Sequence, residues 1–156
     1  MTLTAIGTPE LRELIAAADA AGWVSECHLP DVLIVADRAR LAQVLDNVFG
    51  NARKYAAPPV RVAGALEDDL LTVQITDHGP GVPEGELALV TQRHYRAANA
   101  AGVQGQGLGL HTAYTLMDAM GGALVVANAA DGFSVALTLA CAERQHDPRR
   151  HAFKTI

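Results

Sequence analysis

The feature that most constrains the fold is a stretch between Asp37 and Pro58 that has a helix start, a helical period and a stop. Asp37 is a favourable N-cap residue, and Pro58-Pro59 cannot continue a helix. The apolar residues between them recur at the spacing of one helix face. They are Leu41, Val44, Leu45, Val48, Phe49 and Ala52. Because a helix with one apolar face has to bury it, we expect a second layer of structure to cover this face.

The remaining chain supplies strands and two further helices. Thr8 as an N-cap with Pro9 behind it predicts a first helix that ends at Gly22, and residues 107–120 predict a third helix. Short apolar and alternating runs predict strands at residues 32–35, 60–66, 70–76, 123–128 and 133–140. These elements predict an α/β (α+β) two-layer sandwich, with helices on one face of a sheet.

Composition narrows the class of protein. Half of the 156 residues are apolar, which is enough for one packed domain, and we expect it over residues 1–142 with a polar tail over 143–156. The net charge of −5, without a continuous basic stripe, disfavours nucleic acid or an anionic membrane as a direct ligand. No apolar run reaches the ~18 residues that span a membrane. Cys27 and Cys141 lack metal-ligand spacing, so we expect buried thiols in a reducing, cytoplasmic compartment.

The other face of the central helix is polar in an unusual way. Counting about 100° per residue, one narrow stripe holds Arg40, Gln43, Asn47, Asn51 and Lys54. Asparagine is an unfavourable choice inside a helix, so two of them one turn apart need an explanation. Two explanations stay open: a solvated face that happens to carry amides, or a site in which the Asn51 oxygen ligates Mg²⁺ while Asn47 and Lys54 reach phosphate oxygens.

A carboxylate at the end of an expected strand is the second candidate. Asp77 follows Val73 and Ile75 and enters the turn Gly79-Pro80-Gly81. An ordinary turn with a local side-chain hydrogen bond explains the pattern Asp-x-Gly-x-Gly by itself. In a half-buried site, however, the carboxylate can accept the exocyclic amine of adenine, where guanine carries an acceptor. The second interpretation predicts a preference for ATP over GTP.

A glycine-rich segment, Gly105-Gln106-Gly107-Leu108-Gly109-Leu110, opens the expected third helix. Its unpaired N–H groups and the positive end of the helix dipole suit phosphates. It lacks the Gly-Lys-Ser/Thr of a P-loop and fits the dinucleotide fingerprint badly, so simple helix-start chemistry is the alternative. The segment follows a long irregular stretch whose Arg93 and Arg96 are placed to fold over a triphosphate as a lid.

Together these segments resemble, in the same order, the ATP-binding boxes of sensor histidine kinases. The stretch from Asp37 to Tyr55 resembles the N box, Asp77-x-Gly79-x-Gly81 the G1 box, Arg93-x-x-Arg96 a remnant of the F box, Gly105 to Leu110 the G2 box, and Gly121-Gly122 a glycine pair before the last hairpin. The resemblance covers most of the chain, from about Ala36 to Leu139. It implies the Bergerat ATP-binding fold of gyrase B, HSP90 and MutL, with a mixed, mostly antiparallel sheet of about five strands, about three helices on one face and a flexible ATP lid.

The resemblance also implies a role for each matched residue. On the helix, Asn51 would ligate Mg²⁺, Asn47 and Lys54 would contact phosphates, and Tyr55 would pack on adenine. In the turn that Gly79 and Gly81 form, Asp77 would accept the adenine amine.

Further roles fall on the lid and on the start of the third helix. Val82 would line the base pocket, Arg93 would belong to the lid, and Arg96 would reach the terminal phosphates. Gly105, Gln106, Gly107, Leu108, Gly109 and Leu110 would offer backbone donors to the phosphates. The catalytic residues expected from the resemblance are Asn47, Lys54 and Arg96.

Two departures from the family pattern concern the lid and the G1 box. Thr91 and His94 stand where the F box carries phenylalanines, which leaves the anchoring of the lid open. His78 stands where the G1 box commonly has asparagine, a position whose side chain need not face the base.

The chain carries no helix in which a histidine precedes an acidic residue, as a phosphoacceptor requires. His146-Asp147 is followed by Pro148, which opposes a helix interior. The resemblance therefore implies a catalytic domain that transfers the γ-phosphoryl of Mg-ATP to a histidine on a separate dimerisation domain, with a response regulator downstream. It also implies the cytoplasmic portion of a membrane-anchored kinase. Two alternatives stay open: an ATP-binding regulatory module without phosphotransfer, and a serine kinase of the anti-sigma-factor type.

Overall fold

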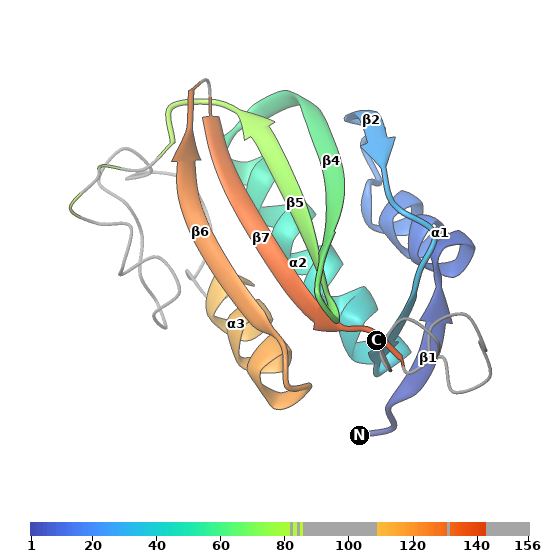
Figure 1. Cartoon of the computed structure of the whole chain (residues 1–156). Helices are drawn as coiled ribbons and strands as arrows, with labels where there is room; N and C mark the ends of the chain where they lie inside the picture. Colours follow the sequence, from blue (N-terminus) through green and yellow to red (C-terminus); the bar gives the residue numbers. More distant parts are fainter. Residues whose placement is uncertain (82, 84, 86–108, 131, 143–156) are drawn as a thin grey trace.

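The computed structural model describes residues 1–81, 83, 85, 109–130 and 132–142, and these form two layers (Figure 1). The elements in chain order are β1 (Thr4–Gly7), α1 (Thr8–Ala18), β2 (Val24–His28), β3 (Leu33–Ala36), α2 (Arg38–Tyr55), β4 (Ala57–Glu67), β5 (Leu70–His78), α3 (Gly109–Ala119), β6 (Ala123–Ala129) and β7 (Gly132–Ala140). Figure 1 shows α2 behind the sheet, and α2 lies between α1 and α3 and contacts both.

The main layer is a five-stranded mixed sheet in the order β2-β4-β5-β7-β6. β2 runs parallel to β4, and the other neighbouring strands are antiparallel. β1 and β3 form a separate two-stranded antiparallel sheet, which Ile34 joins to the end of β7 through a single bridge with Cys141. The predicted α/β sandwich with a mostly antiparallel sheet is confirmed.

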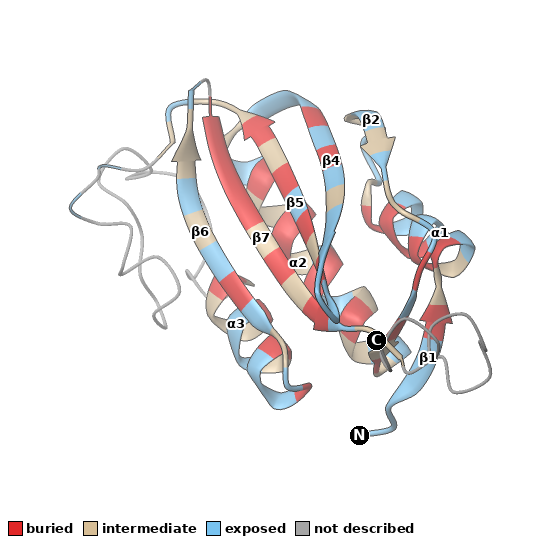
Figure 2. Cartoon of the chain, in the orientation of Figure 1, coloured by how far each residue is buried: buried red, intermediate tan, exposed pale blue. Residues whose placement is uncertain are grey.

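The core lies between the sheet and the helices. Along β5, buried residues alternate with more exposed ones, as the red and pale bands of Figure 2 show. Leu71, Val73 and Ile75 are buried, and Asp77 continues their row toward the helices. The strand period of two therefore carries a carboxylate to the edge of the apolar core.

The central helix α2 forms as the sequence predicts. The Asp37 side chain accepts a hydrogen bond from the Arg40 N–H at 3.1 Å, and the last helical residue is Tyr55. All six predicted apolar residues of this helix are buried. Its apolar face thus holds the helix against the sheet, and its polar stripe lies at the margin of the core.

The beginning of the chain differs from expectation. The N-cap of α1 is Gly7 and not Thr8, whose hydroxyl instead donates to the Pro30 carbonyl at 2.6 Å. The helix ends at Ala18, before Gly22, because the Asp19 carboxylate accepts the N–H groups of the following segment and redirects the chain into β2. Strands β1 and β2 were not predicted, since β1 is short and Val24–His28 has no apolar alternation.

Two strands are longer than the sequence predicts. β4 starts at Ala57 and includes Pro58-Pro59, whose peptide bond is cis, and β5 continues to His78, so that Asp77 lies inside the strand. The expected lid with Arg93 and Arg96 lies outside the described residues.

The two cysteines are free and partly exposed, so the expectation of buried thiols is wrong. Cys27 lies on the edge strand β2, and Cys141 follows the last residue of β7. Among the described helices, none combines the length and hydropathy that crossing a membrane requires.

Candidate functional site

The second half of α2 presents the predicted amide pair at the margin of the core. Asn47 and Asn51 are partly exposed, Lys54 is exposed and Tyr55 is half-buried. Buried residues of the same helix, including Val48 and Ala52, hold these turns against the sheet. The four polar or aromatic side chains therefore project from a fixed support.

Asp77 is the buried carboxylate of the site. It is 6% exposed, and its Oδ1 accepts a hydrogen bond from the Phe133 N–H at 3.0 Å. Burial raises the pKa of Asp77 to about 6, while the Phe133 N–H and the charge of His78 act to lower that pKa. Within the described part of the chain, no residue donates a hydrogen bond to Oδ2. That oxygen is available to a ligand that carries a donor.

The turn after β5 packs against the end of α2. A Cβ atom on Gly79 would stand 3.1 Å from the Ala56 Cα and 3.7 Å from the Tyr55 carbonyl oxygen. Gly81 has a φ of +68°, in the left-handed region that favours glycine. The two glycines thus let the backbone of this turn lie close to the residues that close the helix. The neighbouring His78 directs its Nδ1 to the Pro59 carbonyl at 3.2 Å.

The start of α3 meets the middle of α2. Gly109 is the first residue of α3, and a Cβ on it would stand 3.7 Å from the Asn47 carbonyl oxygen. Leu110 is buried in the core and anchors this first turn. The N-terminal end of α3, which is the positive end of its helix dipole, therefore lies beside Asn47.

The structure accordingly brings nine of the predicted site residues to three neighbouring places: the second half of α2, the end of β5 with its turn, and the start of α3. They are Asn47, Asn51, Lys54, Tyr55, Asp77, Gly79, Gly81, Gly109 and Leu110. The other predicted residues lie outside the described ones. They are Val82, Arg93, Arg96, Gly105, Gln106, Gly107 and Leu108.

Two residues at this site were not found from the sequence. Gly132 and Phe133 begin β7, 55 and 56 positions beyond Asp77, and contact its backbone and carboxylate. The dipeptide Asp131-Gly132 between two expected strands signals a tight turn, but nothing local to it indicates a partner on β5.

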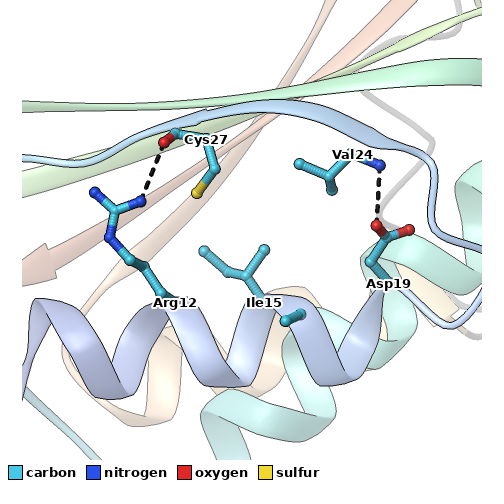
Figure 3. Close-up of a pocket in the computed structure, with 6 residues that line it drawn as sticks. Arg12, Ile15, Asp19, Val24 and Cys27 are labelled. Atoms are coloured by element: carbon cyan, nitrogen blue, oxygen red, sulfur yellow. Dashed lines mark hydrogen bonds between the residues drawn. The ribbon is translucent and has the colours of Figure 1, made fainter.

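A cavity of about 280 Å³ between α1 and β2 is a separate feature (Figure 3). Arg12 donates to the Cys27 carbonyl at 3.1 Å, and Asp19 accepts the Val24 N–H at 2.9 Å. Burial raises the pKa of Cys27, which disfavours a reactive thiolate there. These side chains connect α1 with the edge strand β2. We therefore assign them a structural role and do not place the functional site in this cavity.

Comparison with known proteins decides the family. The family described as "Histidine kinase-, DNA gyrase B-, and HSP90-like ATPase" matches residues 36–143, which include every predicted site residue. The chain belongs to this family. Within this ATPase family, it is an ATP-binding catalytic domain of the kind found in sensor histidine kinases.

Several relatives of this ATPase domain are named as histidine kinases of signal transduction or sensing. It is 35% identical to the signal transduction histidine-protein kinase AfsQ2 of Streptomyces coelicolor over 127 residues, which cover 79% of this chain and 24% of AfsQ2. It is 31% identical to the sensor histidine kinase component HK1 of Mycobacterium tuberculosis, covering 80% of this chain and 75% of HK1. The chain spans about a quarter or less of the length of AfsQ2 and of the Bacillus subtilis kinase WalK.

Solved structures give the same result for the fold. The mycobacterial sensor histidine kinase MprB superposes with a TM-score of 0.75 at 26% identity, covering 90% of this chain and 98% of that one. Full-length ShkA in complex with AMPPNP superposes with a TM-score of 0.69 at 25% identity, covering 91% of this chain and 32% of ShkA. The Bergerat fold implied by the sequence is confirmed.

Proposed function

We propose that this domain transfers the γ-phosphoryl group of Mg-ATP to a histidine on a separate dimerisation domain of a two-component kinase. The observation that carries the proposal is the arrangement around Asp77. Within the described part of the chain, one oxygen of this buried carboxylate receives no hydrogen bond. The turn after it packs on the end of the amide-bearing helix, and the start of α3 contacts the middle of that helix. This arrangement supports one site with partners for the base, the metal and the phosphates.

The adenine base is assigned to Asp77. An ionised carboxylate accepts and cannot donate, so Oδ2 complements the exocyclic amine of adenine and opposes the carbonyl of guanine. Tyr55, half-buried at the end of α2, is assigned to packing on the ring, and Val82 to lining the pocket. ShkA, a structural neighbour, was solved with an ATP analogue, which supports a nucleotide as the ligand of this domain.

Magnesium and the phosphates are assigned to α2 and to the segments on either side of the lid. Mg²⁺ prefers oxygen ligands and shares them with substrate phosphates, and the Asn51 side-chain oxygen suits it. Asn47 and Lys54 lie one turn to either side of Asn51 and are assigned to phosphate oxygens. Gly109 and Leu110, with Gly105 to Leu108 before them, are assigned as backbone donors, and Arg93 and Arg96 as lid residues.

The protein's contribution to the reaction is position and charge. Phosphoryl transfer needs the two oxygens in line and the charge on the transferring group neutralised. Mg²⁺ held by Asn51 would supply much of that neutralisation, and Asn47, Lys54 and Arg96 would orient the terminal phosphates and balance their charge. A buried base site at Asp77 fixes one end of the nucleotide, so that its other end is presented to the histidine in one geometry.

The acceptor, the downstream partner and the location follow from the same proposal. HK1, of which this chain covers 75%, is named a component of a sensor histidine kinase, which supports an acceptor histidine outside the domain. We assign that histidine to the dimerisation domain of the same kinase and the next step to a response regulator. The partly exposed free thiols fit a reducing compartment, so we place the domain at the cytoplasmic side of a membrane-anchored kinase, with no membrane or nucleic-acid contact of its own.

Transfer of labelled phosphate tests the proposal. The domain is mixed with the dimerisation domain of the same kinase and γ-labelled Mg-ATP, with Asp77→Asn as the matched control. We expect acid-labile label on the dimerisation domain only with the unaltered chain. Label that survives acid would indicate a serine kinase, and bound ATP without transfer would indicate a regulatory module; either result contradicts the proposal.

A further inference from the structure

The turn between β6 and β7 lies directly against Asp77. Phe133 donates its backbone N–H to Asp77 Oδ1 at 3.0 Å. A Cβ atom on Gly132 would overlap the Asp77 carbonyl oxygen and would stand 2.8 Å from the carbonyl carbon and 3.1 Å from Oδ1. The backbone and carboxylate of Asp77 therefore occupy the space that any side chain at position 132 would need.

Position 132 requires glycine because there is no room for a Cβ atom. No residue but glycine brings its Cα this close to the backbone of another strand, since every other residue adds a Cβ. The partner strands β5 and β7 are held in register up to the pair Thr76 and Ser134, immediately before this contact. An alanine at 132 has to push either the turn or Asp77 out of place.

The donor itself is firmly held. Phe133 is 6% exposed, and its ring belongs to the apolar core, while its neighbour Ser134 accepts from the Gln74 side chain at 2.9 Å. A backbone N–H anchored on both sides by buried groups keeps its direction better than a polar side chain on a loop does. The Asp77 carboxylate thus has one oxygen fixed, while the other accepts no hydrogen bond from the described residues.

The same turn also reaches the loop that follows β5. A Cβ on Gly81 would stand 2.5 Å from Asn128 Oδ1 and 3.3 Å from the Gly132 carbonyl oxygen. Asn128 lies on β6, opposite Phe133 in the strand register. The β6–β7 turn therefore contacts both the carboxylate and the glycine turn that is assigned to the adenine pocket.

We propose that Gly132 and the Phe133 N–H are positioning residues for adenine recognition: the turn fixes Asp77 Oδ1, so that Oδ2 faces the amine of the base. This inference rests on the proposed nucleotide site and adds to it two residues that act through Asp77. Neither is a catalytic residue, because neither is placed against the substrate. They hold the Asp77 carboxylate in its binding orientation before the base arrives. Less conformational entropy is then lost when the nucleotide binds.

A comparison of the Gly132→Ala variant with a matched control, Gly122→Ala, tests the proposed positioning role. Gly122 lies at the other end of the same hairpin, and a Cβ there would overlap the Thr138 carbonyl oxygen, so both variants strain the hairpin. Calorimetry with ADP is expected to show at least about tenfold weaker binding by Gly132→Ala and unchanged binding by folded Gly122→Ala. Equal losses in the two variants would show that only the stability of the hairpin matters and would overturn the proposal.

A second readout follows the carboxylate itself. Among the described groups that act on Asp77, the Phe133 N–H and the charge of His78 both lower its pKa. Losing the N–H contact should move the titration midpoint of the Asp77 carboxyl carbon, followed by NMR, above about 6 in Gly132→Ala and leave it in place in Gly122→Ala. His78 is present in both variants, so its contribution cancels in the comparison.

A backbone ester at position 133 covers the case in which Gly132→Ala does not fold. Replacing the Phe133 N–H by oxygen keeps the ring and removes only the donor, and we expect the same loss of ADP affinity and the same rise in the midpoint. Unchanged affinity in the ester variant contradicts the inference alone. A failure of the unaltered chain to bind ADP contradicts the proposed function instead.

Discussion

Asp77→Asn should weaken nucleotide binding strongly while it stabilises the free domain. On the ligand side, the asparagine oxygen can still accept the Phe133 N–H at the position of Oδ1, which leaves the NH₂ group where Oδ2 was. A donor then faces the donor of the adenine amine. Losing a hydrogen bond to a charged group costs about 1.5–3 kcal/mol, and leaving polar groups unpaired adds about 1–3 kcal/mol. At about 1.4 kcal/mol per tenfold, the affinity for ADP should fall by roughly 100-fold or more.

The same substitution should increase the free energy of unfolding of the nucleotide-free domain. Burial raises the pKa of Asp77 from 3.8 to about 6, so the folded domain holds a proton that the unfolded chain has already released between these pH values. The free energy of unfolding therefore falls as the pH rises through this window, by about 3 kcal/mol in all at about 1.4 kcal/mol per pH unit. Asparagine does not ionise, so the free energy of unfolding of the variant does not fall in this pH window. Burying one NH₂ group offsets part of this gain. A net gain of about 1–2 kcal/mol is expected above pH 7 and none below pH 4.

Urea unfolding at pH 4 and pH 7.5, without nucleotide, measures the stability, and calorimetry with ADP measures the affinity. The reasoning requires a variant that is more stable than the original at pH 7.5 only, and that binds ADP poorly at both. A variant that is less stable at pH 7.5 would refute the claim that the ionised carboxylate is held at a cost. A variant with unchanged affinity would refute the placement of adenine at Asp77.

Three further predictions concern the metal, the proton and the core. Asn51→Ala should weaken ATP binding in the presence of Mg²⁺ and leave metal-free binding nearly unchanged; equal losses under both conditions would show that the side chain does not coordinate the ion. The Asp77 carboxyl carbon should titrate by NMR with a midpoint near 6 in the free domain, and a midpoint near the ordinary 3.8 would contradict the burial argument. Leu41 is fully buried and lies toward the start of α2, away from the amide pair. Leu41→Ala should lower the free energy of unfolding by about 2–5 kcal/mol in urea titrations, while the folded fraction keeps its ADP affinity. An affinity loss matching that of Asp77→Asn would argue against a local site.

The parts of the fold that were predicted are those whose signals are local. The helix from Arg38 to Tyr55 has its cap, its apolar face and its stop within one stretch of chain, and the structure reproduces all three. The two predicted strands that became β4 and β5 are similar, because each has a local apolar alternation and a tight turn at Asp68 joins them directly. Asp77 was placed correctly at the edge of the core because the strand period before it was clear.

The parts that were missed depend on contacts between distant segments. β2 has a polar sequence and becomes a strand only by pairing in parallel with β4, which follows it after a whole helix. Thr8 has the chemistry of an N-cap but bonds to Pro30 instead, because β1 delivers the chain to α1 from a fixed direction. The contact of Gly132 and Phe133 with Asp77 arises from the register of β5 and β7, which no local pattern specifies.

A crystal structure of the chain with bound ADP and Mg²⁺ tests the central claim most directly. Our account predicts the adenine amine within hydrogen-bond distance of Asp77 Oδ2, with Oδ1 still held by the Phe133 N–H and the phosphates between Asn51 and the start of α3. A base bound elsewhere, or an Asp77 side chain turned away from the amine of a bound adenine, would contradict it.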